Sequence, residues 1–478
     1  MSRNRFRRAG ALALASALAL GGCASKPIPD LRQPSLPAHW SSATPQAAAP
    51  RPPGSAWWQD FHDPQLDALV AQALQDDLEV GQALARLRAA RRLDAVADAT
   101  LRPQLRARTE DPIDPDASAS FLVVGVDSEW ELPLFGRGEA TNRVARGDLQ
   151  SAQANLAQVR AATISDVTHN WIDLRHAQQA ERLLQDIASA RQRQASLQQT
   201  LVDLHLAAPA TAAQAQAAAL QAQSAVNEPR DAAAAAARRL AVLLGRDAPD
   251  PAWSTAAASS APGQLQIAAV DSVPANLLRR RPDIAAHEAE VISAAGALGI
   301  ARADRYGSIG LGGAIRWSTS LLSHRRTATH GIASFGPVID IPLFDWGIRQ
   351  ARAKARGDLL EAATLAYRQT VLSAVNEVED ALTALEQQRR NVETQQQVLQ
   401  AQQQVAEAAQ QRRRLGLGSD LDVATQQAAR DQADLELLEA QRQRDLAYVA
   451  LHTALGSATA PIPGTGTGNG NAREGAQP

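Results

Sequence analysis

The longest uninterrupted helix signal in this chain lies between Arg349 and Arg414, where there is no proline and only one glycine, Gly357. Large apolar residues mark a heptad-like stripe through its middle, at Val371, Val375, Val378, Leu382, Leu385, Val392 and Leu399. Such a stripe is typical of a helix that packs along another helix. At 1.5 Å per residue the predicted helix is roughly 100 Å long, whereas globular helices average about 11–12 residues. No compact domain holds a helix of this length.

The same pattern occurs twice along the chain. One pair of matching runs is LPLFGRGEATNRVARGDL (Leu132–Leu149) and IPLFDWGIRQARAKARGDL (Ile341–Leu359), which align if one residue is inserted. A second pair is RRLAVLLG (Arg238–Gly245) and AYVALHTALG (Ala447–Gly456). The period is slightly more than about 200 residues, which is far longer than the 20–50 residues of solenoid repeats. We therefore predict an internal duplication, in which each half has strands, then a PLF motif, then a long helix.

The first half is predicted to contain one helix before its strands and a helical hairpin after them. Asp63 and Pro64 have the residue types of an N-cap and a first helical position, so a helix is expected from there to about Thr100. The hairpin is expected to run over Glu139–Asp203, turn near Ala207-Ala208-Pro209 and return over Thr211–Leu244.

The second half is predicted to repeat this order. Its elements are a helix over Arg279–Asp304, a long helix over Arg349–Arg414, a turn at Leu415–Asp420 and a return helix over Leu421–Leu455. Asp420 is a candidate N-cap for the return helix. Gly245 and Gly456 follow the two return helices, where a C-capping glycine is common.

Four short segments alternate between polar and apolar residues, which is the period of a β-strand with water on one side only. They lie at Gln104–Arg108, Leu122–Leu132, Ser308–Ser318 and Ile332–Leu343. The second segment has an acidic face, formed by Asp127, Glu129 and Glu131, and an apolar face. Trp130 and Trp317 lie toward strand ends, as the aromatic girdles of membrane barrels do. Each half thus contributes one amphipathic strand hairpin.

The N-terminus has the pattern of a secretory signal peptide: four arginines, a short Ala-Leu run and small residues. The apolar run is too short to cross a bilayer as a helix. Leu20-Gly21-Gly22-Cys23 fits the bacterial lipobox, so we predict lipidation of Cys23; the alternative is an ordinary signal peptide with an incidental cysteine. Cys23 is the only cysteine, which excludes disulfides within the chain. Ala24, where an inner-membrane retention signal has Asp, favours the outer membrane.

The chain is predicted to divide into a signal peptide (1–22), a lipidated Pro-rich tether (23–56), a first structural repeat (57–246), a linker (247–275), a second structural repeat (276–456) and a disordered tail (457–478). Aromatic residues make up only 4% of the chain, so thin packing of Ala-rich helices is expected rather than a thick core. The net charge of −2 argues against nucleic acid as a partner.

The lipobox and five further motifs together resemble the outer-membrane factor family, the TolC-like channel lipoproteins of tripartite efflux systems. The motifs are WWQDFHDPQLDALV, LPLFGRG, LRRRPDIAAHE, PLFDWG and LGLGSDLDV, within Cys23–Gly456. The resemblance implies a mostly α fold with a small β part. Three copies would form a homotrimer, with a 12-stranded transmembrane β-barrel continued by a periplasmic α-barrel. The resemblance also implies a function, that of an exit duct that passively conducts small molecules such as drugs from the periplasm to the exterior. The implied partners are outer-membrane lipid, a periplasmic adaptor (membrane fusion) protein and an inner-membrane transporter.

The sequence departs from the family pattern at two places. Gly307 stands where the family usually has proline before the third strand. The first turn, His205–Ala210, lacks the Gly-Leu-Gly pattern that the second keeps at Gly416–Gly418. Whether the first turn docks an adaptor is therefore left open.

The candidate site residues cluster at the second turn. Leu415, Leu417, Asp420 and Asp422 are candidates for a periplasmic gate, because three copies of an inward residue would ring the axis. Residues two apart on a helix point about 200° apart, so both aspartates cannot face inward. Asp422 is favoured for the lumen and Asp420 for a cap or a pair with Arg413 or Arg414; the alternative is that both only cap and solvate the turn. The candidate adaptor contact is the basic run Arg412, Arg413 and Arg414.

No catalytic residue, metal ligand or cofactor is predicted. His169 and His176 share a helix face but are seven residues apart, whereas a metal pair on a helix usually has a spacing of three or four. Gly310, Gly312 and Gly313 lie in an alternating strand without the Lys-Ser/Thr of a phosphate loop. Two non-channel functions remain as alternatives, an efflux adaptor and a structural coiled-coil lipoprotein. An adaptor would carry one hairpin and more strands, and a scaffold would lack amphipathic strands.

Overall fold

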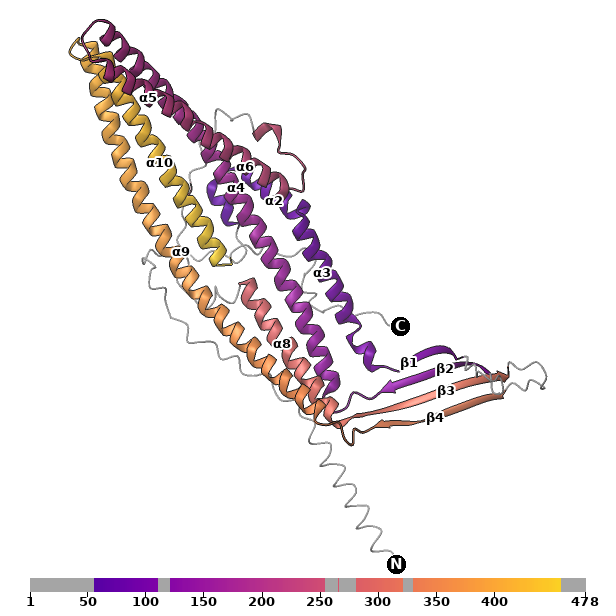
Figure 1. Ribbon diagram of the computed structural model, residues 1–478. Helices are drawn as coiled ribbons and strands as arrows, with labels where there is room; N and C mark the ends of the chain where they lie inside the picture. The colour runs from indigo at the N-terminus through magenta and orange to yellow at the C-terminus, as the bar shows by residue number, and fades with distance from the viewer. Residues whose placement is uncertain (1–55, 111–120, 254–264, 266–280, 321–329, 457–478) are drawn as a thin grey trace, which may run out of the picture. The chain divides into compact units, whose positions relative to one another are not determined.

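A computed structural model of the chain describes residues 56–110, 121–253, 265, 281–320 and 330–456 (Figure 1). The predicted signal peptide, Cys23, nearly all of the tether, most of the linker and the tail lie outside these residues. The described chain forms two compact units. The sheet unit comprises the described parts of Ala85–Asn155 and Asp283–Val371. The hairpin unit comprises the described parts of 56–84, 156–282 and 372–456.

The sheet unit contains four antiparallel strands in the order β1-β2-β3-β4 (Figure 1). They span Gln104–Glu110, Phe121–Glu131, Ser308–Ser320 and His330–Asp340. The two central strands come from different halves of the chain, with Val126 opposite Ile315 and Glu131 opposite Gly310. All four predicted strands are confirmed. The fourth ends at Asp340, short of the predicted Leu343, because Pro342 has no N–H to extend a ladder.

The helices of the sheet unit are the greater part of α3 (Leu78–Ala95), the starts of α4 (Arg137–Asp203) and α9 (Ile348–Arg414), and α8 (Pro282–Ala303). Glycines let α4 and α8 approach closely. A Cβ at Gly147 would lie 2.7 Å from the backbone nitrogen of Ser293, and one at Gly296 would lie 2.7 Å from Val144 Cγ2. Among the described residues, Pro282–Tyr306 is the one helical stretch that is long and apolar enough to cross a membrane.

The two strand-to-helix connections share an unusual backbone. Phe135 (φ 55°) and Trp346 (φ 54°) are both left-handed, and each precedes a left-handed glycine, Gly136 or Gly347. Bulky residues adopt this conformation rarely, since their Cβ crowds the backbone. Its occurrence at both PLF motifs supports the duplication. The left-handed pair begins two residues after Pro133 but four residues after Pro342, so the backbone equivalence of Phe135 and Trp346 is offset from the match of the PLF motifs.

The hairpin unit contains α2 (Pro64–Asp76), α5 (Pro209–Ala225), α6 (Asn227–Leu243), α10 (Asp420–Ala454) and the later parts of α4 and α9. Its core takes side chains from both halves, including Trp57, Leu66, Val70, Ile164, Val167, Leu174, Leu240, Val378, Tyr448 and Leu451. The predicted stripe on α9 is confirmed: Val378 and Leu385 are in this core, and Val392 packs with Leu437 and Ala440 of α10.

Two predicted continuous helices are each broken in the structure. The helix expected from Asp63 to Thr100 stops at Asp76, because the buried carboxylate of Asp77 accepts hydrogen bonds from the N–H groups of Glu79 and Val80 and starts a new helix. The return helix expected over Thr211–Leu244 divides at Val226. Pro229 has no N–H to donate to the carbonyl of Ala225 and its ring crowds that carbonyl.

The predicted helix ends are mostly confirmed. Asp63 caps α2, accepting hydrogen bonds from the N–H groups of Gln65 and Leu66. Gly245 and Gly456 follow their helices with φ of 64° and 63°. The prediction of Asp420 as the N-cap of α10 was wrong. Ser419 holds that position, because its short hydroxyl reaches the N–H of Asp422.

Candidate functional site

The sheet has one polar and one apolar face, as the alternating pattern predicts. On the polar face, Arg316 donates two hydrogen bonds of 3.2 Å to Asp127, and Arg108 lies 4.0 Å from the same carboxylate. The opposite face carries Leu105, Val126, Ile315 and Phe335, which line a shallow apolar groove, and Phe335 is 81% exposed. Such a sheet suits lipid on one side and water on the other.

The turn between α9 and α10 closes with the hydrogen bonds of a Schellman motif. The N–H of Leu417 donates to the carbonyl of Arg412 at 2.8 Å, and the N–H of Gly416 donates to that of Arg413 at 3.0 Å. Gly416 is left-handed, with φ 73°, which glycine adopts without a Cβ penalty. This is the structural reason for the first glycine of the Gly-Leu-Gly pattern.

Both aspartates of this turn are engaged locally. Asp420 accepts two hydrogen bonds from Arg413, of 2.6 and 2.8 Å, and Asp422 accepts from the backbone N–H of Ser419 at 3.0 Å. Arg413 lowers the pKa of Asp420 below its ordinary value, and the Ser419 N–H does the same for the pKa of Asp422. The ion pair between Asp420 and Arg413 is one of the arrangements that the sequence analysis predicted for Asp420.

The basic run at the end of α9 is exposed in this chain, and its three members have different surroundings. Arg413 is committed to Asp420. Arg412 donates to the carbonyl of Leu417 at 3.5 Å, within its own turn. Arg414 is the member whose side chain has no such contact among the described residues.

The turn between α4 and α5 has the same backbone, although its sequence lacks the Gly-Leu-Gly pattern. The N–H of Leu206 donates to the carbonyl of Leu201 at 2.8 Å, and the N–H of His205 donates to that of Val202 at 2.9 Å. His205 is left-handed, with φ 60°, in the place of Gly416. The signal that reveals the equivalence is a shared Leu-x-Leu, at Leu204 to Leu206 and at Leu415 to Leu417.

Each turn exposes a pair of leucines. Leu204 and Leu206 are 61% and 72% exposed, and Leu415 and Leu417 are 72% and 68% exposed. The two turns lie at the same end of the hairpin unit, since Gln194 near the end of α4 donates to Thr425 near the start of α10 at 3.1 Å. Single exposed apolar residues are common, but a matched pair of exposed leucines on each of two neighbouring turns suits a protein contact.

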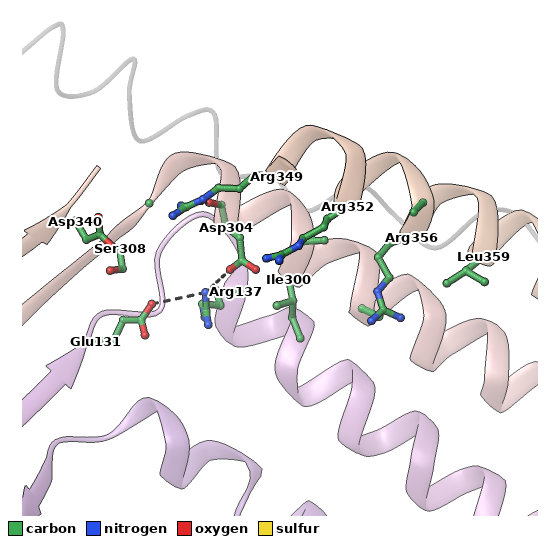
Figure 2. Close-up of a pocket in the computed structure, with 14 residues that line it drawn as sticks. Glu131, Arg137, Ile300, Asp304, Ser308, Asp340, Arg349, Arg352, Arg356 and Leu359 are labelled. Atoms are coloured by element: carbon green, nitrogen blue, oxygen red, sulfur yellow. Dashed lines mark hydrogen bonds and ion pairs between the residues drawn. The ribbon is translucent and has the colours of Figure 1, made fainter. Parts of the chain in front are cut away.

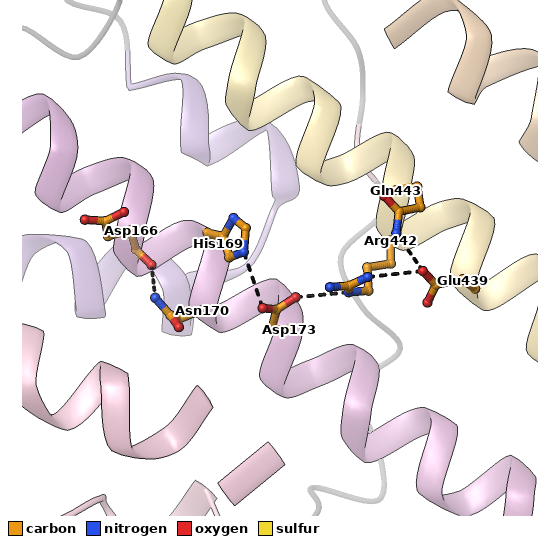
Figure 3. Close-up of polar contacts among 7 residues, drawn as sticks. All are labelled: Asp166, His169, Asn170, Asp173, Glu439, Arg442 and Gln443. Atoms are coloured by element: carbon orange, nitrogen blue, oxygen red, sulfur yellow. Dashed lines mark hydrogen bonds and ion pairs between the residues drawn. The ribbon is translucent and has the colours of Figure 1, made fainter. Parts of the chain in front are cut away.

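Polar contacts join α4 of the first half to α10 of the second (Figure 3). Arg442 donates to Asp173 at 3.0 Å and to Glu439 at 3.1 Å. His169 lies 3.4 Å from Asp173, and His176 lies 3.0 Å from Glu439. Both histidines are therefore placed beside carboxylates, and no group of His, Cys, Asp and Glu within the described residues could hold a metal ion.

Burial shifts the pKa values of two groups beside this network in opposite directions, and both shifts favour the neutral form. It lowers the pKa of His176, which favours the neutral imidazole. It raises the pKa of Asp445 to about 6, despite the pair that Asp445 forms with Arg444. Charged groups that are removed from water shift in this way. The contacts of His176 with Glu439 and of Asp173 with Arg442 join α4 to α10.

A family model described as outer membrane efflux protein matches the chain twice, over 69–246 and 273–457. Nodulation protein T of Rhizobium leguminosarum bv. viciae is 30% identical over 344 residues, which cover 70% of each chain. Outer membrane protein OprJ of Pseudomonas aeruginosa is 27% identical over 94% of this chain and 95% of its own. The solved outer-membrane channel OprN superposes with a TM-score of 0.77 at 26% identity, over 90% of this chain and 98% of OprN.

The chain therefore belongs to the outer membrane efflux protein family. The double match agrees with the duplicated fold, and the likeness to OprN covers strands and helices alike. The chain is an outer-membrane channel protein of the efflux type, which is the function the resemblance implied. The alternatives of an adaptor and of a structural scaffold fit neither the double match nor the amphipathic sheet.

Proposed function

We propose that three copies of this chain close into one conduit across the outer membrane, the exit duct of a tripartite efflux pump. The observation that carries this proposal is the four-stranded amphipathic sheet, whose outer strands β1 and β4 each pair on one side only within the described chain. An open sheet edge in lipid leaves backbone groups unsatisfied, at several kcal/mol each. Eight strands would enclose only side chains, whereas twelve leave a passage.

The oligomer is tested by measuring the mass of the detergent-solubilised protein with light scattering. We expect the mass of three chains, stable to mild heating. A monomeric mass would contradict the proposal. Insertion of the purified oligomer into a planar bilayer should then give discrete conductance steps.

The proposal includes lipidation of Cys23 after removal of residues 1–22. The lipobox Leu20-Gly21-Gly22-Cys23 supports it. Cys23→Ser should block lipid addition and processing at this site, whereas transport should fall only in part, because the strands provide a second anchor. Mass spectrometry of the mature N-terminus provides the test, and an unmodified cysteine there would contradict the proposal.

Conduction is proposed to be passive, with the energy supplied by an inner-membrane transporter that a periplasmic adaptor connects to this chain. The family match supports this, and the contact of Arg442 with Asp173 in Figure 3 joins α10 to α4. Hydrolysis of ATP by the pure protein would contradict this.

The two hairpin turns are proposed to form the periplasmic end, where the adaptor docks and the closed channel is sealed. The exposed leucine pairs and the basic run Arg412–Arg414 support the docking role. For the seal, we favour Leu415 and Leu417 over Asp420 and Asp422, because both carboxylates are held within their own turn. Three leucines around an axis exclude water.

Single-channel conductance separates these candidates. Leu417→Ala should raise the conductance of the closed channel, whereas Asp422→Asn keeps the capping acceptor, removes the charge and should leave the conductance unchanged. Asp420→Asn is the second charge control. A larger rise from either Asn variant than from Leu417→Ala would assign the seal to the carboxylates instead.

A further inference from the structure

A cavity of about 760 Å³ lies in the sheet unit where the strands meet the helices (Figure 2). Its charged lining consists of four arginines and three carboxylates: Arg137, Arg349, Arg352, Arg356, Glu131, Asp304 and Asp340. The arginines outnumber the carboxylates in one small volume. Like charges this close repel unless a counter-charge is present.

The cavity opens on the polar face of the sheet. Glu131 is four residues from Asp127 on β2, so both side chains leave the same face. Glu131 lies opposite Gly310, and Ser308, two residues away on β3, lies opposite Asp340. Glu131, Ser308 and Asp340 all line the cavity. The cavity is thus on the side of the sheet that carries Arg316 and Asp127, and not on the side of Phe335.

Two of the four arginines are neutralised within the unit. Arg137 forms an ion pair with Asp304 and lies 3.6 Å from Glu131, as the dashed lines of Figure 2 show. Arg349 donates to the backbone carbonyl of Asp304 at 2.7 Å and lies 3.8 Å from Asp345. These ion pairs engage Glu131, Asp304 and Asp345, whereas Asp340 of the lining takes part in none of them.

Arg352 and Arg356 differ from them. Both are exposed, and within the described part of the chain neither pairs with a carboxylate. They are four residues apart on α9, so their side chains leave the same helix face. In Figure 2 Arg352 points toward Asp304 and Ile300, and Arg356 lies one turn further along α9. Two adjacent guanidinium forks with free donors match the geometry of a carboxylate or phosphate group.

We propose that this cavity is a transit site for anionic exported molecules, in which Arg352 and Arg356 bind their carboxylate or phosphate groups. The inference rests on the proposed trimer, in which the polar face of the sheet lines the passage and three copies bring six such arginines to one level. The site would raise the local concentration of anions and favour their passage over that of cations. A lipid headgroup is a poorer occupant, because the apolar face that lipid would cover is the opposite one.

The test compares ion selectivity in planar bilayers for the wild-type oligomer and for Arg352→Gln/Arg356→Gln, using KCl gradients. Removal of the two charges should lower the chloride-to-potassium permeability ratio severalfold. Lys354→Gln is the matched control: it removes a positive charge from the same exposed stretch of α9, but Lys354 does not line the cavity. It should leave the ratio unchanged. Citrate added to one side should block the wild-type current more strongly than that of the double variant.

The outcomes separate this inference from the proposed function. If the wild-type protein forms no conducting oligomer, the proposed duct itself fails. If channels form but the double variant keeps the wild-type selectivity and citrate block, the anion site is refuted and the duct stands. An equal shift from Lys354→Gln would also refute it, since the effect would then come from general surface charge. Phospholipid that co-purifies with wild type but not with the double variant, at unchanged selectivity, would assign the arginines to lipid and overturn the proposal.

Discussion

The two hairpin turns have the same backbone but are stabilised by different means. In the second turn, Gly416 occupies the left-handed position, Ser419 and Asp422 form a capping box, and Arg413 pairs with Asp420. In the first turn, His205 occupies the left-handed position, and Ala208 is an N-cap without a side-chain hydrogen bond. Pro209, at the first helical position, sets the backbone there instead. The comparison shows that a turn can keep its shape after losing most of the residues that identify it.

If shape is what the partner recognises, both turns dock equally. Leu415→Ser/Leu417→Ser and Leu204→Ser/Leu206→Ser should then each weaken efflux strongly. Burial of one leucine contributes roughly 1.5–3 kcal/mol, so loss of a pair reduces partner affinity by at least about tenfold. Dye efflux by cells lacking the native gene and complemented with each variant provides the measurement. Full efflux with the first-turn variant alone would show that the diverged turn no longer docks.

The left-handed positions should respond to substitution with opposite signs. Gly416→Val should destabilise the second turn by about 1–2 kcal/mol, because a Cβ there crowds the backbone, although no neighbouring atom lies within 4 Å of it. Gly416→Asn should be milder, since asparagine tolerates this conformation. His205→Gly should stabilise the first turn by up to about 1 kcal/mol. Hydrogen-exchange mass spectrometry of peptides spanning each turn measures the local opening free energy.

Capping residues can be exchanged between the turns. Ser419→Ala should destabilise the start of α10 by about 1 kcal/mol, because it leaves the N–H of Asp422 without its acceptor. Ala208→Ser should supply the acceptor that α5 lacks and stabilise it by a comparable or smaller amount. Hydrogen-exchange mass spectrometry again provides the measurement. Peptides that contain Thr425 report on α10, and peptides that contain Gln214 report on α5. An Ala208→Ser variant that exchanges faster than wild type would contradict the assigned N-cap.

Acid should affect the second turn only. The pKa values of Asp420 and Asp422 are lowered in the folded chain. Their stabilisation is therefore fully present above the unfolded pKa of about 4 and is lost as the pH falls through the folded values. Among the described residues, the first turn has no ion pair like that of Arg413 with Asp420, so its opening should stay constant. In Asp420→Asn/Asp422→Asn, the difference between the turns should no longer change with pH.

The sequence by itself determined the elements that depend on periodicity. The stripe Val371–Leu399 predicts a long packed helix, the alternation from Leu122 to Leu132 predicts a strand with one wet face, and the repeated PLF motif predicts the duplication. The stripe and the alternation are local patterns that follow from the side-chain period of one element, whereas the duplication is visible from the match between two distant segments. The resemblance to the outer-membrane factor family rests on further motifs, among them WWQDFHDPQLDALV and LGLGSDLDV, and the family match confirms the membership.

Only the tertiary structure decided which competing local contacts form. Asp77 and Pro229 break two helices that look continuous by their apolar pattern, and Ser419 caps α10 although Asp420 has a suitable side chain. Asp420 is instead held by Arg413, which is brought back to it by the chain reversal. The equivalence of His205 and Gly416 is likewise a property of backbone angles. Arg352 and Arg356 line a cavity together with Glu131, Ser308 and Asp340, which are distant in the sequence. The sequence does not predict this grouping, because residue spacing along one element carries no information about its neighbours in space.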